Sequence, residues 1–234
     1  MNGSKDLKTI IYFKGVYDTL DLFTDHLIEA FESMGYGTFV YHTANEEVCK
    51  KMLLRLLDES QEFAVVTFNN LGYNLSFEQS EAAEDEEKKP EEHNIWNYFH
   101  IPYIDILMDH PFHYEKPLCN MPETAVILCT DRNHVKYIRR FFKNIHQTDF
   151  LPHAGVELGH KHKPLNDRNI DVLYAGALPI YTVAKMIPDL HSIPEVDGEH
   201  MMQSVLGELV QHPEQTTEQA IEAYVKSVRG DISD

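Results

Sequence analysis

Residues 101–114, with the sequence I-P-Y-I-D-I-L-M-D-H-P-F-H-Y, constrain the fold more than any other part of the chain. A short β-branched and aliphatic run of this kind is typical of a strand buried on both faces, as in a parallel sheet covered by helices. Pro111 cannot continue such a strand, so the chain must leave it directly after Asp109 and His110. These two proton-carrying side chains are therefore expected at the carboxyl end of a central strand, where open α/β sheets bind ligands.

Strand and helix patterns alternate along most of the first 150 residues. Short apolar runs predict strands at 9–14, 38–42, 63–68, 124–130 and 149–152. Apolar residues at helical spacing fill the segments between the first three runs, and connections of this length favour parallel strands with right-handed crossovers. The predicted fold class is therefore α/β: a Rossmann-like parallel sheet flanked by helices, with a helical C-terminal extension.

Some helix starts and faces can also be predicted. Thr43 and Glu46 have the spacing of a capping box at the start of the second helix. The buried stripe of that helix is expected to contain Val48, Met52, Leu53 and Leu56. Asp131 directly follows a predicted strand and is well placed to cap the helix after it.

Changes in composition divide the chain into three parts. Residues 1–158 are predicted to form the Rossmann-like domain, interrupted at 78–93 by an acidic run that is expected to be a mobile, solvated loop or a frayed helix. The polar segment 159–169 is interpreted as a linker. Residues 170–234 show patterns for one strand, at 170–174, and three helices, at 179–190, around 205–210 and at 217–228. This is less than a second α/β domain of ~100 or more residues needs. They are expected to be either the start of a truncated second domain or a tail that packs on the first.

The acidic composition limits the possible partners and locations. A formal net charge of −18 argues against binding to nucleic acids or anionic membranes, which both require basic surface. No stretch reaches the ~20 apolar residues of a membrane span, and the N-terminus lacks the apolar region of a signal peptide. Cys49, Cys119 and Cys129 are odd in number and far apart, so reduced, buried thiols are expected. These features favour a cytoplasmic protein.

The order of the strand ends resembles a known family. The motifs I-D-I-L-M-D-H-P, C-T-D-R-N-H, F-L-P-H-A-G and I-D-V-L-Y-A-G follow one another as in the N-terminal half of bacterial two-domain glycosyltransferases of the GT-B type, similar to spore-maturation CgeB-like proteins and related group 1 enzymes. The resemblance covers roughly residues 9–179 and consists of pattern order, without a single diagnostic motif. The resemblance implies that this domain binds the acceptor and that a second domain binds a nucleotide sugar. The implied reaction transfers the sugar to a hydroxyl acceptor without an obligatory metal. This chain would then be half an enzyme, inactive alone.

Asp109 and His110 are the candidate catalytic residues. Sugar transfer with inversion needs a base that deprotonates the acceptor hydroxyl, and a carboxylate or a histidine can supply it. Both residues stand at the predicted strand end where that base would be required. The structural alternative is that Asp109 accepts hydrogen bonds from loop amides while His110 packs against the turn at Pro111.

Other strand ends supply candidate substrate-binding residues. These are Lys14, Gly15, Asn69, Asn70, Asp131, His153 and Gly176. Each has a plainer structural interpretation: the asparagines suit a turn, Asp131 a helix cap, and Lys14-Gly15 is not part of a G-x-G-x-x-G motif. Gly176 is included because the family resemblance puts it beside the donor phosphates. Trp96, the only tryptophan, is expected in the core rather than as an aromatic platform for a ligand.

No metal or other cofactor is expected. The 14 histidines include no helical pair of the H-E-x-x-H kind and no cysteine pair that could complete a zinc site. Two other classes of function stay open beside the glycosyltransferase. One is a non-catalytic, flavodoxin-like module that binds a ligand or regulates a partner. The other is an interaction protein whose C-terminal helices bury apolar faces in a homodimer.

Overall fold

The computed structural model describes residues 8–58, 62–79, 91–155, 163–170, 172 and 197–229. The chain divides into two compact units, Met1–His160 and Lys161–Asp234, and each is described by itself. The acidic residues 80–90 and the predicted helix at 179–190 lie outside the described residues, as does most of the predicted strand at 170–174.

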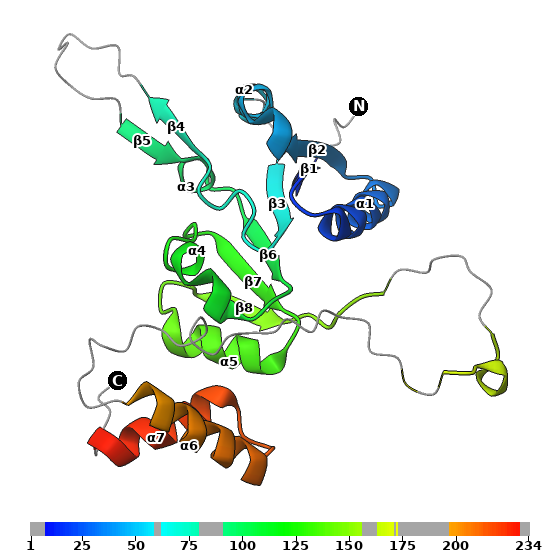
Figure 1. Cartoon of the computed structure of the whole chain (residues 1–234). Helices are drawn as coiled ribbons and strands as arrows, with labels where there is room; N and C mark the ends of the chain where they lie inside the picture. The colour runs from blue at the N-terminus through cyan, green and yellow to red at the C-terminus, as the bar shows by residue number, and fades with distance from the viewer. Residues whose placement is uncertain are drawn as a thin grey trace. The chain divides into compact units, whose positions relative to one another are not determined.

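The first unit is built on a six-stranded sheet in the order β2-β1-β3-β6-β7-β8, with every neighbouring pair parallel (Figure 1). The strands are β1 Lys8–Lys14, β2 Gly37–His42, β3 Glu62–Phe68, β6 Tyr103–Leu107, β7 Ala125–Cys129 and β8 Gln147–Phe150. The second strand of the chain pairs on one side of β1, and all later strands of the sheet extend from its other side. This is a doubly wound, Rossmann-like arrangement, so the predicted fold class is confirmed.

Two apolar clusters, one on each face, hold the sheet between helices. On one face α1 (Asp18–Ser33) covers Ile10, Tyr12 and Val66. On the other face, residues of four further helices join one large cluster that includes Ile11, Val65 and Ile127. These helices are α2 Glu46–Leu57, α3 Ile95–Tyr98, α4 Glu115–Cys119 and α5 Arg132–Phe141. Alternate residues of each central strand point to opposite faces, and both faces are buried, which explains the nearly continuous apolar runs in the sequence.

The start of α2 differs from the expected capping box. The Thr43 hydroxyl donates to the carbonyl oxygens of Lys14 and Gly15, and no side chain caps α2. A 3-10 turn, η1 (Thr43–Asn45), precedes the helix. The buried residues of α2 are Leu53 and Leu57, which lie one helical turn apart. The predicted stripe is therefore confirmed at Leu53 and wrong at Val48 and Met52, which are 60% and 55% exposed.

The acidic segment at 78–93 is not a loop at its ends. Strand β4 (Ser76–Gln79) pairs antiparallel with β5 (Glu91–Asn94), and the two form a ribbon separate from the main sheet (Figure 1). The Phe77 ring lies 5.0 Å from the ring of Tyr98 at the end of α3, so apolar packing holds the base of the ribbon. The prediction of a loop over all of 78–93 is therefore wrong at both ends, which belong to β4 and β5. The acidic composition of the segment concealed the packing of Phe77 directly before it.

The second unit contains two packed helices, α6 (Gly198–Gln211) and α7 (Thr217–Arg229), and the short 3-10 turn η3 (Leu165–Asp167). Val205, Ala220 and Tyr224 form the small buried cluster between the helices. The Tyr224 hydroxyl and His200 Nδ1 lie 3.1 Å apart across it. Among the described residues of either unit, no helix has the length and apolarity that crossing a membrane requires.

Candidate functional site

The loops that follow β1, β3 and β6 meet at the carboxyl edge of the sheet. These three strands are parallel neighbours, so their carboxyl ends lie at the same edge. The order of the strands reverses at β1, which makes the gap between the β1 and β3 loops the point where doubly wound sheets bind ligands. The sequence predicted candidate residues in all three loops.

Asn69 and Asn70 form a tight turn directly after β3. Both have positive φ angles, 47° and 65°, and the backbone N–H of Leu71 donates to the Phe68 carbonyl at 3.1 Å. Two successive positive φ angles define a type I′ turn, which asparagine tolerates better than other side-chain-bearing residues. The expectation that these asparagines form a turn is therefore confirmed.

The Asn69 side chain joins this turn to the end of β6. Its Oδ1 accepts a hydrogen bond from the Met108 N–H at 2.8 Å, and its Nδ2 donates to Asp109 Oδ2 at 2.9 Å. Its own N–H donates to the Ile106 carbonyl at 3.2 Å. The amide group thus uses both ends to fix the loop that carries the Asp109 carboxylate.

Asp109 is exposed and firmly oriented. Oδ2 accepts from Asn69 and also from the Tyr114 hydroxyl, at 2.8 Å. The other oxygen, Oδ1, accepts no hydrogen bond from any residue that the structure describes. Burial raises the pKa of Tyr114 well above its usual value, and the hydrogen bond to Asp109 and the proximity of Tyr17 raise it further. Tyr114 therefore remains a donor, and Oδ1 is an acceptor with a fixed orientation.

His110 belongs to a different set of contacts. Its Nδ1 accepts from the Phe112 N–H at 3.1 Å and so caps the 3-10 turn η2 (Pro111–Tyr114). The ring packs edge-on against two rings of α5, with centroids 4.6 Å from His134 and 5.0 Å from Tyr137. The structure thus brings Asp109 together with Asn69, and His110 together with α5.

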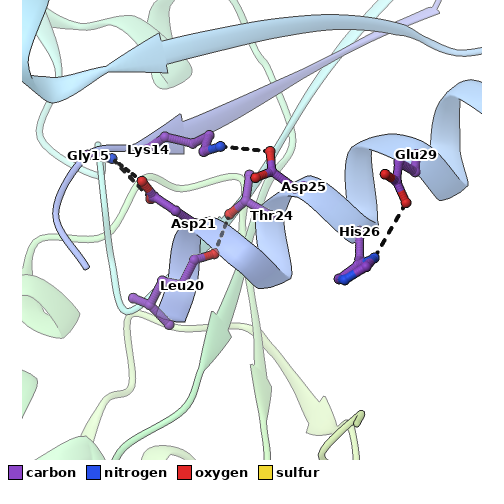
Figure 2. A network of polar contacts seen from close by, with 8 residues as sticks. All are labelled: Lys14, Gly15, Leu20, Asp21, Thr24, Asp25, His26 and Glu29. Carbon is purple, nitrogen blue, oxygen red and sulfur yellow. Dashed lines mark hydrogen bonds and ion pairs between the residues drawn. The ribbon is translucent and has the colours of Figure 1, made fainter. Parts of the chain in front are cut away.

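Figure 2 shows that the donors after β1 are occupied by acidic residues of α1. The Lys14 ammonium lies 2.7 Å from Asp25 Oδ1, and the Gly15 N–H donates to both oxygens of Asp21, at 3.0 and 3.1 Å. Gly15 has a φ of 94°, and a Cβ on it would lie 2.5 Å from Cε1 of His42. The loop therefore requires glycine, yet it presents carboxylates where nucleotide-binding sheets present free amides.

The remaining predicted residues are spread more widely. Asp131 Oδ1 accepts from the Asn133 N–H at 2.6 Å and caps α5, as the sequence indicated. His153 is exposed in the segment after β8, and Gly176 lies outside the described residues. Trp96 is fully buried in the core, also as predicted, with its Nε1–H donating to a loop carbonyl. Within the described part of the chain, no three His, Cys, Asp or Glu side chains are grouped as metal ligands would be.

One residue of the site was missed in the sequence. Asp105 is fully buried in the middle of β6, and its Oδ1 accepts from the Asn70 N–H at 2.9 Å. Burial raises its pKa from 3.8 to about 7, although the Asn70 hydrogen bond works in the opposite direction. The available signal was a single acid inside an otherwise apolar strand, which calls for a partner or a changed pKa.

The fold and this edge define a class: a doubly wound, Rossmann-like α/β protein with a polar carboxyl-edge cluster made by Asn69, Asp105, Asp109 and Tyr114. Comparison with known proteins adds no narrower assignment. No family model, no curated protein and no solved structure matches the chain.

Proposed function

We propose that the carboxyl edge binds a hydroxyl-bearing small molecule, as the acceptor-side half of a glycosyltransferase that takes sugar from a nucleotide sugar. The Asp109 carboxylate carries this proposal. Two donors hold its Oδ2, and its Oδ1 is open to a ligand. A carboxylate held in this way can accept the hydrogen bond of a hydroxyl and, as the sugar arrives, its proton.

The charges around the edge favour a neutral ligand over a phosphate. The carboxylates of Asp21 and Asp25 already occupy the N–H of Gly15 and the ammonium of Lys14. An incoming phosphate would compete with both and would be repelled by Asp109. A polyol or glycoside carries no such penalty, and the nucleotide sugar would be gripped by a separate domain, as the family resemblance implies.

An exposed aromatic ring beside the cluster fits the same kind of ligand. Tyr17 follows β1, is 60% exposed, and lies near enough to Tyr114 to help raise the pKa of that hydroxyl. Ligand sites commonly combine an apolar or aromatic surface with a few oriented polar groups. A sugar ring could rest its C–H face on Tyr17 while one hydroxyl donates to Asp109.

The test is an NMR titration of the isotope-labelled protein with a panel of methyl glycosides. Asp109→Asn keeps the shape of the side chain and removes the charged acceptor, so we expect binding to weaken at least about ten-fold. Asp58→Asn is the matched control, because Asp58 is an exposed carboxylate at the C-terminal end of α2, away from this edge. Equal affinity of both variants for every glycoside that binds would refute the proposal.

The strand order supports a second candidate, a non-catalytic module of flavodoxin-like shape. The order β2-β1-β3-β6-β7 matches the flavodoxin-like pattern, which binds its ligand at the β1/β3 switch point. Titration with UDP, GDP and FMN distinguishes the two. A nucleotide that binds wild type and Asp109→Asn equally, with shifts centred on Gly15, would favour the module over the transferase half.

A further inference from the structure

We infer that Asp105 is a positioning residue for the carboxyl-edge site: its buried carboxylate holds the Asn69–Asn70 turn and, through Asn69, fixes the Asp109 carboxylate. The identity of the ligand at that edge depends on the proposed function, but the linkage between these side chains does not.

The linkage consists of three hydrogen bonds that the peptide bond between Asn69 and Asn70 joins. Asp105 Oδ1 accepts from the Asn70 N–H at 2.9 Å. The adjacent residue, Asn69, accepts from the Met108 N–H at 2.8 Å and donates to Asp109 at 2.9 Å. Movement of the Asn70 amide therefore moves the side chain that orients Asp109.

The turn needs this support because its backbone is strained. Asn69 and Asn70 both occupy the left-handed region, which L-residues seldom adopt at two successive positions and which persists where surrounding contacts enforce it. The hydrogen bond that the Asn70 N–H donates to Asp105 Oδ1 is one of those contacts, and it is buried in the core. Asn70 is only 4% exposed.

Asp105 makes no other side-chain hydrogen bond within the described residues. Its Oδ2, and both polar atoms of the Asn70 side chain, are buried without hydrogen-bond partners there. A single hydrogen bond compensates only part of the cost of burying a charged carboxylate, so the pKa of Asp105 is raised. A change in the charge of Asp105 therefore acts directly on the hydrogen bond that the Asn70 N–H donates.

The neighbouring ionisable groups stay neutral near pH 7. Those coupled to Asp105 are Tyr103 on its own strand, Tyr114 in η2 and Cys129 on β7. Burial raises the pKa of each of them, that of Cys129 to about 11. With a pKa of about 7, Asp105 is the member of this group that changes charge near neutrality.

Deprotonation of Asp105 should tighten the turn. A carboxylate accepts a stronger hydrogen bond than a neutral carboxyl group does. Order at Asn70 and Met108 is therefore expected to increase as the pH rises through about 7. The same buried charge lowers the global stability of the domain. Local order and global stability thus change in opposite directions, which a purely structural acid would not produce.

The test is a pH titration of the wild-type protein by ¹⁵N NMR, from about pH 5.5 to 8.5. We expect the backbone amides of Asn70 and Met108 and the side-chain amide of Asn69 to share one titration step near pH 7. The hydrogen-exchange protection factor at Met108 should rise about five-fold across it. Asp105→Asn should abolish the step at all three groups.

Three results would overturn the inference. The first is a step confined to Asn70, since the turn would then not transmit it. The second is the absence of any step in the wild type. This result refutes the inference even if Asp105→Asn fails to fold. The third is a step that persists in Asp105→Asn or disappears in Asp109→Asn, because another group would then be titrating. No ligand is needed, so this test and the glycoside titration can fail independently.

Discussion

The replacement Asp105→Asn should stabilise the first unit at pH 8 and leave its stability nearly unchanged below about pH 4. Asparagine has almost the same shape, can still accept the Asn70 N–H through its own oxygen, and carries no charge. At pH 8 the wild type must keep an ionised carboxylate in the apolar interior of the sheet, whereas the variant does not.

The magnitude follows from the pKa of Asp105, which burial raises from 3.8 to about 7. The folded protein binds the proton more tightly than the unfolded chain does. The free energy of unfolding is therefore highest below about pH 4 and falls as the pH rises through the folded-state pKa. A pKa difference of about three corresponds to about 4 kcal/mol at pH 8, which is an upper bound for the gain from Asp105→Asn.

Urea denaturation followed by the fluorescence of Trp96 measures this gain. Trp96 is the only tryptophan and is fully buried in the core of the first unit, so the signal reports on this unit. The stability difference between variant and wild type should grow between pH 5 and 8. Asp58→Asn, which changes an exposed carboxylate, should show no such growth. A difference that is independent of pH, or a variant less stable than the wild type at pH 8, would refute the reasoning.

Two further predictions concern backbone positions and a helix cap. Gly72→Ala should destabilise the protein by about 3 kcal/mol or more in urea denaturation, because Gly72 has a φ of 79° and the new Cβ would overlap the buried Phe13 ring. Gly35→Ala, at a φ of 90° with open space around it, should cost only about 1 kcal/mol, and an equal cost at both positions would contradict this account. Asp131→Ala should cost about 1 kcal/mol in the same assay, since it removes the cap that accepts from Asn133. Unchanged stability would show that the cap contributes nothing.

Much of the fold was predictable because strands buried on both faces leave a strong pattern. The runs that became β1, β3 and β7 were located to within one residue. The central strand was also recognised, but β6 ends at Leu107, so the chain leaves it before Asp109 and His110 and earlier than Pro111 indicated. The hairpin of β4 and β5 was missed, because its strands are short and every residue in them except Phe77 is polar. β8 lies two residues earlier than predicted, since Gln147 and Thr148 give it a polar start.

The candidate site was predictable as a location but not as a set of contacts. Parallel strands bring their carboxyl ends together, so Asn69 and Asp109 could be expected at one edge although they are 40 residues apart. The sequence alone does not predict which hydrogen-bond donors at this edge are already paired with protein acceptors. Asp21 lies in the first turn of α1, where an acid complements the helix dipole, and its hydrogen bond to the Gly15 N–H depends on where that helix starts relative to β1.

The position of Asp105 is difficult to explain by stability alone. Its cross-strand neighbours include Ile127, and an apolar side chain there would avoid the cost of a buried charge. The left-handed Asn69 and Asn70 lie directly above it, and they are two of the three non-glycine residues with positive φ among those described. A buried acid, a strained turn and unpaired polar atoms thus occur together at one strand end, beside the exposed Asp109. Unfavourable local features concentrate in this way where a protein must hold reactive groups in place, which supports the proposal of a functional site at this edge independently of any family resemblance.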